Sequence, residues 1–64
     1  MVRINGVEEN AAGKTVAEHL SESGFDIKRV AVELNGEILP KSRYESMVLQ
    51  DGDSVEIVSF VGGG

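Results

Sequence analysis

Two Asn-Gly dipeptides, Asn5-Gly6 and Asn35-Gly36, each stand between short runs in which apolar and polar residues alternate. An Asn-Gly pair supplies the positive φ angles that both central residues of a type I′ turn require, so this arrangement strongly indicates a β-hairpin. The flanking runs predict strands at 2–4 and 7–9, and again at 30–34 and 37–39. Most of the expected sheet therefore comes from two hairpins.

A short helix is predicted between the hairpins, beginning at Val16. Thr15 and Glu18 have the spacing of a capping box. Val16 and Leu20 share one face of the helix, and Gly24 is placed to follow its end in the left-handed conformation. A helix of this length does not persist alone, so we expect it to be held by packing on the sheet.

The last third of the chain predicts a connector and then the longest strand. Pro40 lacks an N–H group and is expected to end the second hairpin. Tyr44 and Met47 are the expected anchors of an irregular or one-turn helical segment. Residues 50–53 predict a turn, and residues 54–61 predict the final strand.

The order of these elements predicts a small α+β domain in two layers. Alternation along the strands separates an inner face, covered by the helix, from an open face. The residues predicted to line the inner face are Val2, Ile4, Val30, Val32, Leu34, Val55 and Ile57.

Size and composition restrict the function. A domain of 64 residues has little room for an enclosed active site, so the chain is not expected to be an enzyme. The sequence contains no Cys, which excludes disulfides, thiolate metal sites and a Cys nucleophile. A net charge of -5 disfavours nucleic acid as a partner. With no membrane-length apolar stretch and no signal-like start, we expect a soluble cytoplasmic protein without a membrane partner.

Three local patterns are interpreted as structural. Residues 13–15 end like a phosphate-binding loop, but the earlier glycine that the motif requires is replaced by Glu8. His19 has no nearby Cys or second His, so we expect a solvated or half-buried structural side chain. Asp51 and Asp53 are typical turn residues. No metal site is predicted.

The whole chain resembles the ThiS family, the ubiquitin-like sulfur carriers of thiamine biosynthesis. The resemblance rests on residues 4–6, 15–18, 32–37 with Pro40, 50–58 and 60–64. It implies a β-grasp (ubiquitin-like) fold, in which a mixed sheet of four to five strands wraps on one main helix and the first and last strands lie parallel at the centre. It further implies a β-grasp domain at 1–61 and a flexible tail at 62–64.

The resemblance also implies where the chemistry takes place. In the family an E1-like adenylating enzyme of the ThiF type uses ATP and Mg²⁺ to activate the terminal carboxylate, here that of Gly64. Sulfur from a donor such as a cysteine desulfurase then gives a thiocarboxylate, which passes its sulfur to thiazole synthase (ThiG type). The carrier binds no cofactor, supplies no catalytic side chain and is expected to be a monomer when free. Gly62 and Gly63 would let the tail enter a narrow channel, because glycine has no Cβ.

The final strand predicts a docking surface. If Val55 and Ile57 face the core, then Val58 and Phe60 lie on the open face of the sheet. Exposed apolar pairs of this kind mark interaction sites. The alternative is that the alternation shifts near the end of the strand and Phe60 packs inward.

Three other functions are compatible with the sequence. The small subunit of molybdopterin synthase uses the same thiocarboxylate chemistry, although its chains are usually longer. A ubiquitin-like protein modifier would be conjugated to lysines through Gly64. A binding module of the same fold would keep an inert tail.

Overall fold

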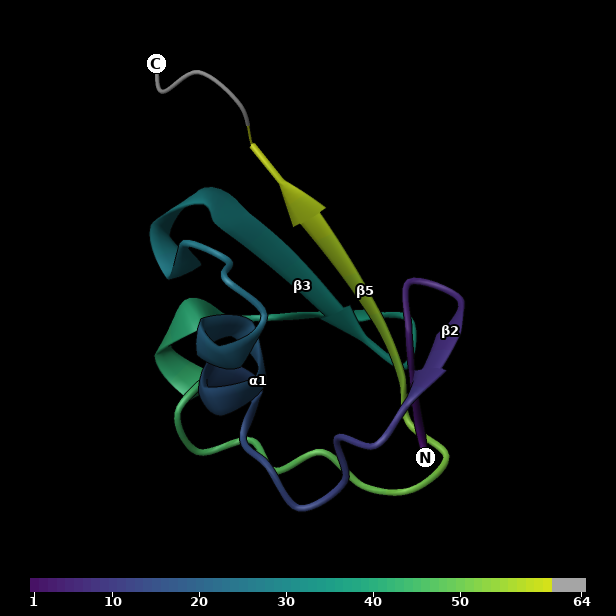
Figure 1. The fold of residues 1–64 in the computed structure, drawn as a ribbon. Coiled ribbons are helices and arrows are strands. Elements are labelled where there is room, and N and C mark those ends of the chain that lie inside the picture. The colour runs from purple at the N-terminus through teal and green to yellow at the C-terminus, as the bar shows by residue number, and fades with distance from the viewer. Residues whose placement is uncertain (61–64) are drawn as a thin grey trace.

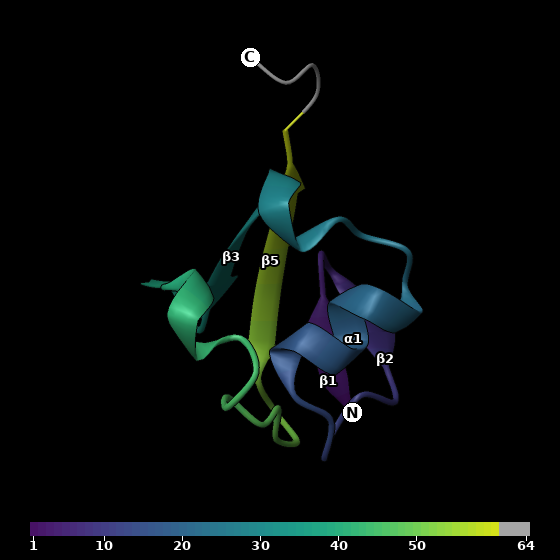
Figure 2. The ribbon, with the colours of Figure 1, turned by 90° about the vertical axis from the view of Figure 1, so that its left-hand side faces the viewer.

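One mixed sheet of five strands and one α-helix make up the fold of residues 1–60, which are the residues that the computed structural model describes (Figure 1). The helix lies against one face of the sheet, as the second view shows (Figure 2). The elements are β1 (Val2–Ile4), β2 (Val7–Glu9), α1 (Val16–Glu22), the 3₁₀ turn η1 (Ile27–Arg29), β3 (Val30–Leu34), β4 (Glu37–Leu39), the 3₁₀ turn η2 (Lys41–Arg43) and β5 (Ser54–Ser59).

The strand order is β2-β1-β5-β3-β4, which places the last strand at the centre of the sheet. β5 runs parallel to β1 and antiparallel to β3, and the two hairpins extend the sheet to its edges. The predicted pairing of the first and last strands is confirmed. β4 ends at Leu39, directly before Pro40, as expected.

Both Asn-Gly turns have the backbone conformation that the sequence predicts. The φ angles are 50° at Asn5 and 84° at Gly6, and 52° at Asn35 and 85° at Gly36. Positive φ at both central residues defines a type I′ turn, whose twist matches that of the flanking strands. The turn chemistry therefore fixes the register of each hairpin.

The capping box at the start of α1 is complete. The Glu18 backbone N–H donates to Thr15 Oγ1 at 3.1 Å, and the Thr15 backbone N–H donates to Glu18 Oε1 at 2.8 Å. At the other end Ser23 is the C-cap and Gly24 has a φ of 82°. The N–H of Phe25 donates to the carbonyl of Leu20, five residues earlier, at 2.9 Å. This is the hydrogen bond of a Schellman motif that spans the greater number of residues.

Acidification is expected to weaken this cap. The hydrogen bonds from the Thr15 backbone N–H and side chain, and then the charge of Lys14, lower the pKa of Glu18 from its ordinary value of 4.5. A lowered pKa in the folded state gives a stabilisation that is present above pH 4.5 and is lost as the pH falls through the folded-state pKa. Urea denaturation at several pH values from 7 to 3 measures the free energy of unfolding of wild type and of Glu18→Gln. We expect wild type to be the more stable protein at pH 7 and the difference to disappear in acid. A constant difference between the two proteins would contradict this.

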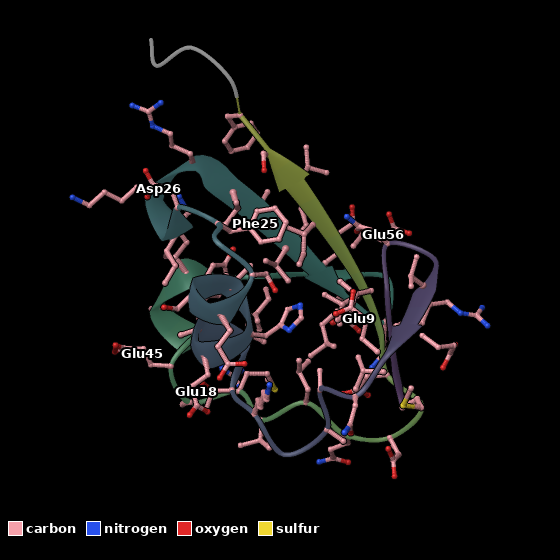
Figure 3. All side chains as sticks on the ribbon, in the orientation of Figure 1. Glu9, Glu18, Phe25, Asp26, Glu45 and Glu56 are labelled. Carbon is pink, nitrogen blue, oxygen red and sulfur yellow. The ribbon has the colours of Figure 1, made fainter. Side chains whose placement is uncertain are left out.

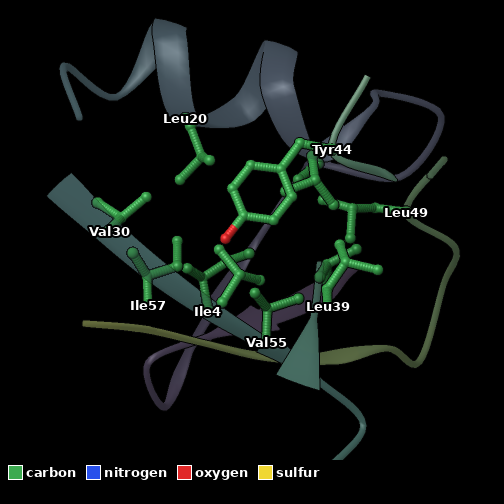
Figure 4. Packing of buried hydrophobic residues seen from close by; sticks show 12 residues of the cluster. Ile4, Leu20, Val30, Leu39, Tyr44, Leu49, Val55 and Ile57 are labelled. Atoms are coloured by element: carbon green, nitrogen blue, oxygen red, sulfur yellow. The ribbon is translucent and has the colours of Figure 1, made fainter. Parts of the chain in front are cut away.

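The core lies between α1 and the inner face of the sheet, with Tyr44 from the connector inserted among the aliphatic side chains (Figure 4). Six of the seven residues predicted for the inner face are buried, and Leu34 is partly buried. The buried apolar residues are Val2, Ile4, Ala11, Val16, Leu20, Val30, Val32, Leu39, Tyr44, Leu49, Val55 and Ile57.

The expectation of a solvated or half-buried His19 is wrong. His19 is 6% exposed, because it lies three residues after Val16 and shares the buried face of α1 with Leu20. Its Nε2 atom lies 3.5 Å from Ser23 Oγ. His19 is therefore part of the packing of the helix.

Candidate functional site

β5 is the element that leads to the glycine tail, and it is held on both sides. β1 pairs with its first two residues, Ser54 and Val55, and β3 pairs with residues 55–59. At its far end the backbone N–H of Phe60 donates to the carbonyl of Arg29 at 2.7 Å. The chain is thus fixed up to Phe60.

Asn5 adds a connection to β5 that the sequence analysis missed. Its Nδ2 donates to the carbonyl of Ile57 at 3.1 Å, and its Oδ1 accepts from the N–H of Ile57 at 2.7 Å. β1 ends at Ile4, so the side-chain amide of Asn5 continues the ladder for one more residue of β5. The second turn acts similarly, because Asn35 Oδ1 accepts from the N–H of Ser54 at 2.9 Å.

Asn5→Ala is expected to destabilise the protein by about 2–3 kcal/mol, from two lost hydrogen bonds and a side chain placed at positive φ. Asn5→Gly is the matched variant, since it loses the same hydrogen bonds but accepts the φ of 50°. We expect it to cost about 1 kcal/mol less than Asn5→Ala. Urea denaturation measures both values. Full stability in Asn5→Gly would show that the bonds to Ile57 contribute nothing.

The two apolar residues predicted for docking are exposed. Val58 and Phe60 each retain 55% of their accessible surface, whereas Val55 and Ile57 retain 2% and 7%. The alternation of β5 holds from Ser54 to Val58, and Ser59 and Phe60 are both exposed. The alternative that Phe60 packs inward is wrong. Val58 lies on the face of the sheet opposite α1, since Val55 and Ile57 point into the core. Phe60 is exposed just beyond the end of the strand.

Further residues share this face, because their strand neighbours point into the core. Ala31 and Glu33 alternate with Val30 and Val32 of β3, which are buried. We define the open face by its six residues, which are Ala31, Glu33, Ile38, Glu56, Val58 and Phe60. Ile38 is 78% exposed, the highest value among the large apolar residues of the described chain.

The remaining predicted site residues, Gly62, Gly63 and Gly64, lie outside the described residues, as does Val61. Gly64 lies four positions after Phe60 in the sequence. Four residues span at most about 14 Å when fully extended. A protein that reacts with Gly64 must therefore place its reacting atoms within about 14 Å of Phe60.

An open polar depression lies at the start of β5, at the opposite end from Phe60, and it is lined by Met1, Arg3, Glu8, Gly52, Asp53 and Ser54. The guanidinium of Arg3 is paired there with Glu8 at 3.0 Å. Within residues 1–60 no group of three or more His, Cys, Asp or Glu side chains could hold a metal ion. None of the helices in that part of the chain is long and apolar enough to cross a membrane.

Comparison with known proteins gives a consistent result. The model of the ThiS family matches residues 2–64. A sulfur carrier protein ThiS of Thermus thermophilus is 42% identical over 64 residues, with 100% of both chains covered. A thiazole synthase of Paramagnetospirillum magneticum is 53% identical over 62 residues, which are 95% of this chain but only 19% of that protein. A crystal structure of the thiamine biosynthesis protein ThiS from Geobacter metallireducens has a TM-score of 0.77 at 36% identity, and the match covers 98% of this chain and 97% of the other. These matches confirm the β-grasp architecture.

Proposed function

The chain belongs to the ThiS family, and from this we propose that it is a sulfur carrier protein of thiamine biosynthesis that holds its sulfur as a thiocarboxylate on Gly64. The observation that carries the proposal is the family match over residues 2–64, which includes all three glycines of the tail. The fold supports it, since β5, the strand at the centre of the sheet, is the element that immediately precedes this part of the chain.

The chemistry follows from the nature of a carboxylate. An α-carboxyl group has a pKa of about 3.5, so it is an anion at neutral pH and a poor electrophile. We propose that an E1-like activating enzyme transfers AMP from ATP to the carboxylate, with Mg²⁺ held by that enzyme. The terminal sulfur of a persulfide, formed on a cysteine of the partner by a donor such as a cysteine desulfurase, then attacks the carbonyl carbon, and AMP leaves. The product is an acyl disulfide. A second thiol of the partner attacks the partner's own sulfur, which forms a disulfide there and frees the thiocarboxylate. The carrier provides the carbonyl group and no catalytic side chain.

Thiazole synthase is the proposed acceptor of the sulfur. A segment 53% identical to this chain accounts for a fifth of a thiazole synthase polypeptide. In that relative, carrier-like and synthase segments belong to one chain, which supports a direct contact between the corresponding proteins. Because the activation step consumes ATP, we place these reactions in the cytoplasm.

Gly63 would act as a spacer that a partner can enclose, and Gly62 would join it to the body of the carrier. A residue without Cβ lets two backbones approach closely. The distance limit of about 14 Å from Phe60 means that the partner must also contact the body of the carrier. The tail delivers the reacting group, and the surface around Phe60 positions it.

A transfer assay tests the pathway. Carrier loaded with sulfur at Gly64 is mixed with thiazole synthase and its small-molecule substrates, or with the large subunit of molybdopterin synthase and its precursor. We expect sulfur to be lost from the carrier, one atom per chain, in the first mixture only. Loss in the second mixture alone would assign the chain to molybdopterin synthesis, and isopeptide-linked products in cells would identify a protein modifier.

A further inference from the structure

Two carboxylates face each other at the middle of the open face. Glu33 of β3 and Glu56 of β5 are direct partners in the antiparallel register, and both are exposed. Directly opposed residues have Cβ atoms about 4.5–5.5 Å apart, and like charges at this distance are destabilising. Figure 3 shows Glu56 on the side of β5 away from α1.

Neither carboxylate forms an ion pair within residues 1–60. Arg3 of β1 lies on the same face beside Ser54, but its guanidinium is paired with Glu8. The four ion pairs of that region join the N-terminal amine to Asp51, Arg3 to Glu8, Lys14 to Glu22 and Arg29 to Asp26. None of them involves Glu33 or Glu56. The free protein therefore retains two opposed negative charges at the centre of an exposed sheet face.

Exposed apolar side chains lie on two sides of this pair. Ile38 is the direct partner of Glu33 on β4, and Val58 follows Glu56 on the same face of β5. When a partner covers this face, the apolar contacts around the pair exclude water from it, as the ring of contacts around a binding hot spot does. Alternate residues of a strand are about 7 Å apart, so Glu56 lies about 14 Å from Phe60. This distance is within the footprint of a protein that reaches Gly64.

We propose that the open face binds a surface of thiazole synthase on which an arginine, flanked by apolar side chains, lies between Glu33 and Glu56. This inference rests on the proposed function and deepens it by naming the recognition chemistry. Arginine fits because its planar guanidinium has five donors, is weakly hydrated and can bond two carboxylates at once. The repulsion in the free carrier is then relieved in the complex, which favours the bound state.

Glu33→Gln and Glu56→Gln test the inference, because glutamine keeps the shape of the side chain and removes its charge. Each variant should melt about 2–4 °C above wild type, since one like-charge contact is removed. Each should also bind thiazole synthase about tenfold more weakly, because the cation loses a charged partner. Glu45→Gln is the control, since Glu45 is an exposed carboxylate outside the open face (Figure 3). Its affinity should stay within about twofold of wild type.

The outcomes separate this inference from the proposed function. The inference is overturned if both open-face variants bind thiazole synthase as tightly as wild type, or if Glu45→Gln loses as much affinity as they do. The proposed function still stands in either case, provided that the carrier accepts sulfur. Wild type that accepts sulfur but does not bind thiazole synthase also overturns it. Wild type that accepts no sulfur from a competent activating enzyme overturns the proposed function itself.

Discussion

Gly64→Ala is expected to lower kcat/KM for adenylation by about 100-fold, because a methyl group beside the reacting carboxylate displaces it within the channel of the activating enzyme. The carboxylate must approach the α-phosphorus of ATP in one orientation. Glycine allows the backbone to take any φ there, and alanine does not. Pyrophosphate release at several carrier concentrations measures the change.

Gly62→Ala is the matched control for this variant. The element shared by the family is a terminal Gly-Gly, so the first of the three glycines is the one that the proposed chemistry needs least. We expect Gly62→Ala to change adenylation by less than about fivefold. Equal rates for Gly64→Ala and wild type would show that the last residue does not enter a confined site.

Leu20→Ala is expected to leave much of the protein unfolded at 37 °C. The Leu20 side chain is 0% exposed, and it joins α1 to the sheet above Val30 and Ile57 (Figure 4). Removing such a side chain costs about 3–5 kcal/mol through lost burial and a residual cavity. A core of this size supplies little more than about 3–5 kcal/mol of net stability.

The measurement for Leu20→Ala is urea denaturation followed by circular dichroism. Leu34→Ala is the control, since Leu34 is a partly buried leucine at the end of β3. It should cost about 1–2 kcal/mol, because part of its side chain is already in contact with water. A loss below about 1 kcal/mol for Leu20→Ala would mean that α1 does not depend on this contact.

Local sequence patterns predicted most of the fold, because most of its elements are specified by adjacent residues. The Asn-Gly turns, the Thr15 and Glu18 capping box and the alternation of β5 each act over a few positions, and all are observed. Ala11 and Leu49 were missed as core residues although each is at most 2% exposed. Both lie in connectors, where no periodicity indicates which side chain turns inward.

The candidate site was predictable only in part. The exposure of Val58 and Phe60 was predicted from the alternation of one strand. The bonds from Asn5 to Ile57 join residues 52 positions apart, and the Glu33 and Glu56 pair depends on the register of two distant strands. Such contacts follow from the sheet topology, which short-range patterns do not specify.

Intact mass spectrometry of the carrier shows whether Gly64 accepts sulfur as a thiocarboxylate. The protein is incubated with a ThiF-type activating enzyme, ATP, Mg²⁺ and a sulfur donor, and is then treated with a thiol-alkylating reagent. Since the chain contains no Cys, a thiocarboxylate is the group expected to react strongly. We expect the mass of the protein to rise by the difference between one sulfur and one oxygen atom, and a single alkylation to follow. Both changes should be lost when Gly63 and Gly64 are deleted. A carrier that gains neither AMP nor sulfur, or that is still alkylated after the deletion, would contradict the proposal that Gly64 carries sulfur.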